Sequence, residues 1–343
     1  MKNISKLLVL AVLLVALATN SLYAEVWIGD KGAKTNQKAS ATCLPATNSN
    51  ELTVNNVRAY LETNGTMWFK EIAEYEVPKN SGKTSMFCAA LWIGGLDVNR
   101  QLKLAAVRFR QIGDDYWTGP LTLIGATIDQ ETCSQYDKHF PMSQKMVREH
   151  ISNWENPEYA MPAAIRDWPA HGDQSKGQSY YLAPFYDVDG DGEYNPYNGD
   201  YPYYDFENEL CPWTLENIEK AAQGLLPKTP EELWMNSPAQ ASLPVKTNNM
   251  VYADHVLKGD ETLFWIFNDK GGNHTESKGE PIGLEIRGQA FAFTTNDHIN
   301  NMTFYSYEII NRSTYTLTNT YFSQWVDPDL GYSHDDYVGC DVA

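Results

Sequence analysis

The sequence predicts a mainly β protein: an antiparallel β-sandwich of jelly-roll-like type, with short helical insertions and a calcium-loop insertion. Three observations carry this prediction. Short aromatic and β-branched runs alternate with turn residues over two long stretches, residues 52–123 and 251–340. Helical periodicity is confined to two short segments between them. An Asp-rich run with a calcium-loop spacing lies in the same intervening region.

The first 24 residues have the pattern of an export signal. Lys2 and Lys6 precede an apolar run, residues 7–18, and Ala24 offers a small residue for cleavage. Because this run is shorter than the ~20 residues of a spanning helix, we expect no transmembrane span in the mature chain. A retained N-terminal anchor is the alternative. The pattern predicts export to the medium or the outer cell surface, and residues 25–51 are predicted to be a loose leader.

A β-rich domain is expected over residues 52–343. Its first part should contain strands because aromatic and apolar runs are separated by turn residues such as Asn64-Gly65 and Gly94-Gly95. The expected strands cover residues 57–61, 67–69, 75–77, 89–93 and 102–109.

An insertion is predicted over about residues 130–250. Within residues 136–154, Met142, Met146 and Val147 recur at helical spacing, which indicates a short helix. A second helix is predicted over residues 214–225, and the proline-rich residues 227–244 are typical of a surface loop.

The C-terminal third should return to strands, over residues 262–267, 282–295, 302–311 and 315–326. Residues 282–295 alternate between an apolar face with Ile286 and a polar face with Glu285 and Arg287. We expect one intertwined domain rather than two sandwiches. The ending at Cys340 to Ala343 predicts the front portion of a longer polypeptide or a truncated product.

The charge balance excludes some partners. With 26 Lys and Arg against 44 Asp and Glu, the formal net charge is −18. Binding to nucleic acid depends on Lys and Arg displacing cations from phosphates, so nucleic acid is not an expected partner. Converging carboxylates instead favour divalent cations such as calcium.

The first predicted calcium site is a D-x-D-x-D-G run in which oxygen ligands at alternate positions curl around one ion. The twelfth position holds Asn198 where an EF-hand has a bidentate Glu, so Asp200 is the expected substitute if the loop closes differently. A bare acidic turn is the alternative. The predicted ligands are Asp187, Asp189, Asp191, Glu193, Asn195 and Asp200.

A second and weaker calcium site is predicted near the end of the sequence, because closely spaced carboxylates repel one another unless water or a cation neutralises them. A solvated loop is the equal alternative. The residues are Asp327, Asp329, Asp335, Asp336 and Asp341.

Catalytic chemistry has little support in the sequence. It contains neither an H-E-x-x-H nor a G-x-S-x-G motif, so no catalytic residue is assigned. His171 is interpreted as a loop histidine bonded to Asp173 rather than a general base. The five Cys include no C-x-x-C pair; export permits disulfides, whose pairing the spacing leaves open.

Several runs together resemble a family of large secreted surface proteins of Bacteroidetes, substrates of the type IX secretion system. The runs are residues 75–78 with 81–84, 91–95, 187–195 with 199–202, and 311–313 with 329–331. The resemblance implies a cell-surface or extracellular location and contact with the secretion machinery. It implies no catalytic residues.

These observations predict a secreted or cell-surface, calcium-stabilised β-rich module, non-catalytic, for adhesion or surface structure. Surface glycans or proteins are the expected partners, because the chain has 21 Tyr and 10 Trp that suit such contacts. The alternative is a secreted polysaccharide-degrading hydrolase or its carbohydrate-binding part.

Overall fold

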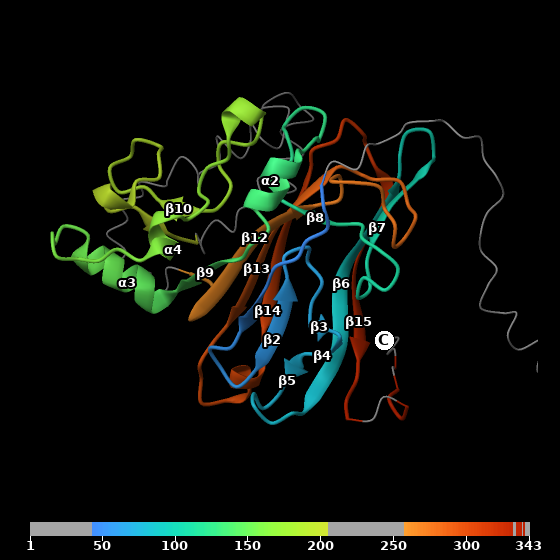
Figure 1. The fold of residues 1–343 in the computed structure, drawn as a ribbon, viewed down its shortest axis with the longest axis horizontal. Coiled ribbons are helices and arrows are strands. Elements are labelled where there is room, and N and C mark those ends of the chain that lie inside the picture. The colour runs from blue at the N-terminus through green and yellow to red at the C-terminus, as the bar shows by residue number, and fades with distance from the viewer. Residues whose placement is uncertain (1–42, 205–256, 332–333, 338, 340–343) are drawn as a thin grey trace, which may run out of the picture. The chain divides into compact units, whose positions relative to one another are not determined.

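The computed structural model describes residues 43–204, 257–331, 334–337 and 339. The predicted signal peptide, the predicted helix at 214–225 and the proline-rich segment at 227–244 lie outside these residues. Within them the chain is mainly β, as the sequence predicts, and its sheets are antiparallel (Figure 1). The jelly-roll connectivity stays a prediction.

The first sheet is built around one long strand, β6, which has neighbours on both sides. Its order is β1 (Ser49–Leu52), β2 (Arg58–Glu62), β5 (Tyr75–Glu76), β6 (Thr84–Leu96) and β15 (Thr318–Pro328), and β7 (Leu102–Ala106) pairs with the far end of β6. A small separate hairpin is formed by β3 (Phe69–Lys70) and β4 (Ile72–Ala73).

The second sheet combines the C-terminal third with two strands from earlier in the chain. Its order is β14 (Phe304–Asn311), β13 (Leu284–Ala292), β12 (Glu261–Asn268) and β8 (Trp117–Thr118), and β9 (Phe140–Ser143) pairs with the other end of β12. A 3-10 helix, η3 (His298–Asn301), precedes β14.

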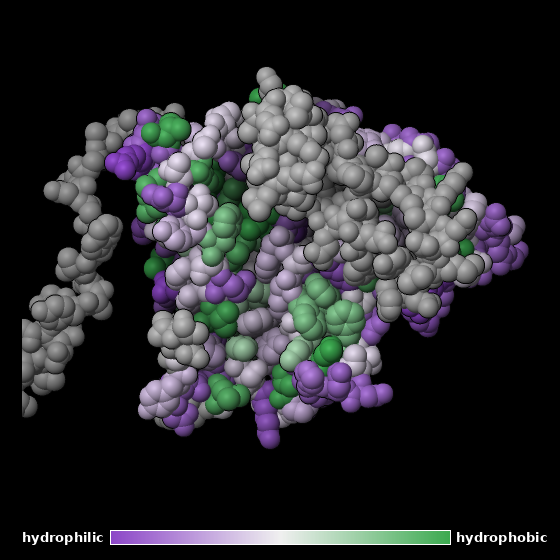
Figure 2. Space-filling model, turned by 180° about the vertical axis from the view of Figure 1, so that it is seen from behind, coloured by the Kyte–Doolittle hydropathy of each residue, from purple (hydrophilic) through white to green (hydrophobic). Residues whose placement is uncertain are grey.

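The main hydrophobic core lies between the two sheets. Leu61 and Ile93 of the first sheet and Trp265 and Ile286 of the second belong to one buried cluster, and each is at most 1% exposed. Residues from both β-rich stretches therefore share a single core, which makes one sandwich rather than two. Other hydrophobic side chains reach the surface, as the view from behind in Figure 2 shows.

A second core lies on the opposite face of β12. Since neighbouring residues of a strand point to opposite faces, Phe264 and Ile266 of β12 point away from Trp265 and pack against the insertion. The insertion contains α2 (Gln130–Gln135), α3 (Gln144–Asn153), α4 (Ala163–Arg166), the 3-10 helices η1 (Gln174–Lys176) and η2 (Pro196–Asn198), and the strands β10 (Phe185–Tyr186) and β11 (Tyr201–Pro202).

Three boundaries differ from the sequence prediction. The helix expected over 136–154 begins only at Gln144, because residues 140–143 pair with β12 and Ser143 caps the helix by accepting a bond from Met146 N. The predicted turn at Gly94-Gly95 is wrong, since β6 continues through both glycines and Gly94 pairs with Leu104 and Tyr321.

Order also begins before residue 52. Cys43 forms a disulfide with Cys133, and Thr47 N donates a 3.0 Å hydrogen bond to Asp137 Oδ2. These links hold the end of the predicted leader against the insertion. Strand β1 starts at Ser49, within the segment predicted to be a loose leader. Among the helices of the described ranges, none has the length and apolar character needed to cross a membrane.

Candidate metal centre

A two-strand hairpin brings the ends of the Asp-rich loop together. Strands β10 and β11 pair antiparallel, with Tyr186 opposite Tyr201 and their rings stacked at 5.0 Å between centroids. Asp187 follows β10 directly and Asp200 precedes β11 directly. The hairpin therefore closes residues 187–200 into one loop and places the two carboxylates side by side.

Three carboxylates converge at the base of this loop. One oxygen from each of Asp187, Asp189 and Asp200 lies within 4.8 Å of the others. Asp187 and Asp200 are buried, and Asp189 is exposed. This is the one such group of His, Cys, Asp and Glu side chains found in the part of the chain that the structure describes.

Backbone N–H groups fix the two buried carboxylates. Asp187 Oδ1 accepts a 2.6 Å bond from Gly190 N, and Gly190 has the left-handed φ of +76° that lets the chain turn back here. Asp200 accepts 2.8 Å bonds from Val188 N and Asn195 N, one on each oxygen. Each carboxylate oxygen keeps a second lone pair for another interaction.

The electrostatics of this group are unbalanced. Burial raises the pKa of Asp200 to about 6, its two backbone hydrogen bonds oppose this, and the charges of Asp187 and Asp189 add to the increase. None of the ion pairs between described residues joins a Lys or Arg to any of the three. A bound divalent cation would supply the missing positive charge.

The remaining predicted ligands of the first site have other roles in the structure. Asp191 Oδ1 accepts a 2.8 Å bond from Glu193 N, and both side chains are exposed. Asn195 caps η2 by accepting a 3.1 Å bond from Tyr197 N. The structure thus brings together three of the six predicted residues, and the expected substitute Asp200 is one of them.

Two histidines position the loop, and the sequence analysis did not assign them this role. His171 is not bonded to Asp173 as expected: its Nδ1 faces Tyr180 O at 3.2 Å, and its Nε2 accepts a 2.8 Å bond from Tyr194 N inside the loop. His150 Nε2 on α3 lies 3.0 Å from Asp200 O. Burial lowers the pKa of both imidazoles, which favours their neutral forms.

The second predicted calcium site gains no such geometry. Asp327 is the last residue but one of β15, and Asp336 Oδ2 accepts a 3.1 Å bond from Leu330 N. Asp341 lies outside the described residues. Asp327, Asp329, Asp335 and Asp336 do not form a group like that of Asp187. The second site stays a prediction.

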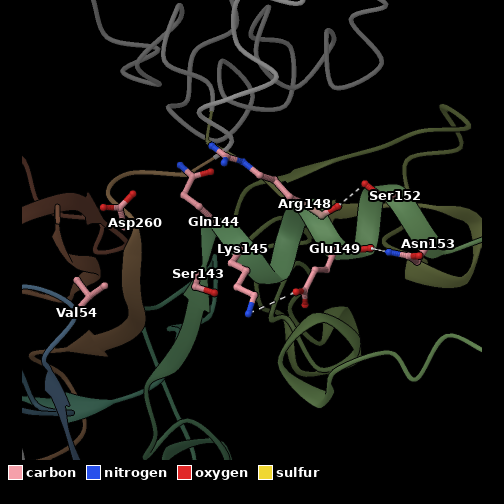
Figure 3. A pocket seen from close by; sticks show the side chains of 9 residues that line it. All are labelled: Val54, Ser143, Gln144, Lys145, Arg148, Glu149, Ser152, Asn153 and Asp260. Carbon is pink, nitrogen blue, oxygen red and sulfur yellow. Dashed lines mark hydrogen bonds and ion pairs between the residues drawn. The ribbon is translucent and has the colours of Figure 1, made fainter. Parts of the chain in front are cut away.

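A polar groove beside α3 is the other candidate site (Figure 3). It has a volume of about 610 Å³ and lies between α3, Val54 of the β1–β2 loop and Asp260 before β12. The face of α3 that lines the groove carries side chains of both charges, and Lys145 Nζ lies 3.7 Å from Glu149 Oε1. These exposed charges offset each other along the helix, so we assign no chemistry to the groove.

Comparisons of the chain with protein-family models, with curated proteins and with solved structures find no match.

Proposed function

We propose that the protein is a secreted or cell-surface β-rich module, stabilised by calcium, that serves adhesion or surface structure. The observation that carries the proposal is the convergence of Asp187, Asp189 and Asp200 at the base of one loop. The type IX secretion resemblance, which implies contact with the secretion machinery, belongs to the same proposal.

The donor set fits calcium. All three groups are carboxylates, the hard oxygen ligands that calcium takes in irregular and flexible geometry. Carboxylates that are buried without a counter-ion cost free energy, so an ion here would stabilise the folded state. When bound, it would supply positive charge and tie β10 to β11 through Asp187 and Asp200.

Two further features support export. The first 24 residues have the pattern of a signal peptide, and Cys43 is joined to Cys133. Disulfides form and persist mainly in oxidising compartments such as the cell exterior. A protein that works outside the cell also meets calcium concentrations high enough for a modest site of this kind.

The test is thermal unfolding of the chain from residue 25 in EDTA and across a calcium titration, with magnesium as the control ion. A ligand that binds only the native state adds about 2.7 kcal/mol at a hundred times its dissociation constant. We expect a calcium-selective rise in melting temperature. Equal melting curves in EDTA and calcium would contradict the proposal.

Variants locate the effect. Asp189→Asn should abolish the calcium-dependent rise and leave the curve in EDTA almost unchanged, because Asp189 is exposed. Asp191 is a predicted ligand that lies outside the group of three converging carboxylates. We therefore expect Asp191→Asn to keep the calcium-dependent rise in melting temperature. The exposed Glu158→Gln, which makes the same change of charge outside the loop, should behave like the parent.

The polysaccharide-degrading hydrolase, or its carbohydrate-binding part, is the second candidate. An apolar groove of about 450 Å³ on the first sheet favours this candidate. Gly94, which has no side chain, lines it together with Trp92, Leu104 and Tyr321. Aromatic walls of this kind stack on sugar rings. Release of new reducing ends from plant or algal glycans would support the enzyme, and silence across the panel would favour the module.

A further inference from the structure

Strand β15 forms the edge of the first sheet. It pairs with β6 along one side, from Thr318 opposite Leu96 to Pro328 opposite Met86. On its other side the structure places no strand from the described ranges. Among the described residues, β15 is therefore an edge strand of 11 residues whose outer side pairs with no other strand.

The middle of β15 has little of the protection that natural edge strands carry, since its register shifts lie near its two ends and its proline is Pro328. Such strands are usually short, or they carry Lys, Pro or an inward-facing charge that blocks pairing with another chain. Residues 318–326 contain no charged residue and no proline. Every second residue directs its N–H and C=O groups away from β6, as in any antiparallel ladder, so these groups are ready to pair with an added strand.

Apolar side chains are exposed on both faces of this strand. Phe322 and Val326 lie opposite Ile93 and Ala89 of β6, which belong to the core, yet they are 60% and 37% exposed. Neither side chain belongs to the main core cluster or to the partly buried residues packed against it. Tyr321 on the other face is 75% exposed.

One end of the strand is acidic. Asp327 lies one residue before the end of β15, and Asp329, Asp335 and Asp336 follow it closely in the sequence. Asp329 Oδ1 is buried and has no hydrogen-bond partner within the described structure. A positive charge beside Asp327 would therefore be stabilised. The formal net charge of −18 disfavours pairing between two copies of this chain and favours a cationic partner.

We propose that the open edge of β15 binds an extended segment of another protein, which adds to the first sheet as an antiparallel strand. The segment carries apolar side chains at alternate positions, to cover Phe322 and Val326, and Lys or Arg at its N-terminal end, beside Asp327. The inference deepens the adhesion part of the proposed function by giving its partner a chemistry, and it does not depend on the calcium loop.

The probe is a labelled synthetic peptide with Lys-Lys at its N-terminus followed by alternating Val and Thr, titrated with the full chain by fluorescence anisotropy. Two control peptides are used. One has the same composition with Lys-Lys at the C-terminus, and the other has the parent sequence N-methylated at every second residue. The N-methylated peptide lacks the N–H donors along one edge and should bind at least about tenfold more weakly than the parent peptide. The peptide with Lys-Lys at its C-terminus should bind about threefold more weakly. Titrations in EDTA and in calcium separate this result from the fate of the metal site.

Matched variants place the peptide on the protein. Phe322→Ser should weaken binding by about fivefold through lost apolar contact, and Asp327→Asn should remove the preference for N-terminal Lys. Ile112→Ser is the control, since Ile112 is 61% exposed and lies in the loop after β7, outside β15. Melting curves confirm that each variant is folded.

Four results would overturn the inference. The N-methylated peptide binds as well as the parent peptide; Phe322→Ser binds no more weakly than Ile112→Ser; the chain dimerises through this edge with loss of peptide binding; or soluble oligosaccharides displace the peptide. The last result would assign the surface to a carbohydrate instead.

Discussion

Glu285 and Arg312 form an ion pair inside the protein, with Arg312 Nη2 3.1 Å from Glu285 Oε1. Arg287 Nη2 lies 2.9 Å from the same oxygen, and Leu121 N donates a 3.0 Å bond to Oε2. Burial raises the pKa of Glu285, but the charges of Arg312 and Arg287 and their hydrogen bonds lower it more, so the net shift is downward. The ionised carboxylate therefore joins β13, the segment after β8 and the segment after β14.

Replacement of Glu285 by Gln should be strongly destabilising. It leaves two guanidinium groups buried without this compensating charge, which typically costs about 3–5 kcal/mol. Because the folded pKa is depressed, the stabilisation is present above the unfolded pKa of ~4.3 and is lost as pH falls through the folded value. Urea unfolding of Glu285→Gln against the exposed Glu280→Gln at neutral and acidic pH checks this, and equal midpoints for the two would contradict it.

The same strand shows what the sequence can predict. Alternation over residues 282–295 predicts a strand, and β13 occupies Leu284–Ala292 with Ile286 in the core. The alternation does not reveal that the polar face is buried too: Glu285 is 0% and Arg287 is 4% exposed. That burial depends on Leu121 and Arg312, which are distant in sequence, and no local pattern reports it.

The candidate metal centre likewise has some residues that the sequence predicts and others that only the fold brings in. The D-x-D-x-D-G spacing points to Asp187 and Asp189 because the motif is local. Asp200 joins them through the pairing of β10 with β11, which is why the local motif predicts it only as a substitute ligand. His171 takes a role in the loop because Tyr194 N reaches its ring, 23 residues along the chain. Contacts of this kind come from tertiary packing.

His139 should make the protein sensitive to mild acid. Its ring packs 5.3 Å from that of Trp265, and neither of its nitrogens has a hydrogen-bond partner in the described structure. Burial lowers its pKa to about 3, against a smaller opposing effect of Asp137. The neutral ring thus stabilises the fold above the unfolded pKa of ~6.5, and this contribution is lost as pH falls toward the folded value.

His139→Leu tests this dependence. The variant removes one protonation that accompanies unfolding, which is worth up to ~1.4 kcal/mol per pH unit below about 6.5. The free energy of unfolding, measured from pH about 4 to 7, should fall less steeply for the variant than for the parent. Parallel profiles would show that the ring is already solvated or protonated in the folded state.

The disulfide should be a large contribution to stability. Cys43 and Cys133 are 90 residues apart, so their link restricts much of the unfolded chain. Loss of such a bond typically costs about 2–5 kcal/mol. In a background with Cys211 and Cys340 replaced by Ser, reductant should lower the melting temperature of the parent and leave Cys43→Ser/Cys133→Ser unchanged. A reductant effect that survives in the double variant would place the sensitivity elsewhere.

Gly199 is expected to control the shape of the metal loop, because it precedes Asp200 with a φ of +99°. An added Cβ would lie 2.8 Å from Trp154 Cε2, so Gly199→Ala brings both backbone strain and a clash with α3. Gly82→Ala is the matched control: its φ is +69°, and no atom lies within 4 Å of its added Cβ. Both variants should lose the ~1 kcal/mol of a strained backbone, and only Gly199→Ala should also weaken the calcium-dependent rise in melting temperature. If the two variants respond alike to calcium, then the contact between Trp154 and the loop does not position Asp200.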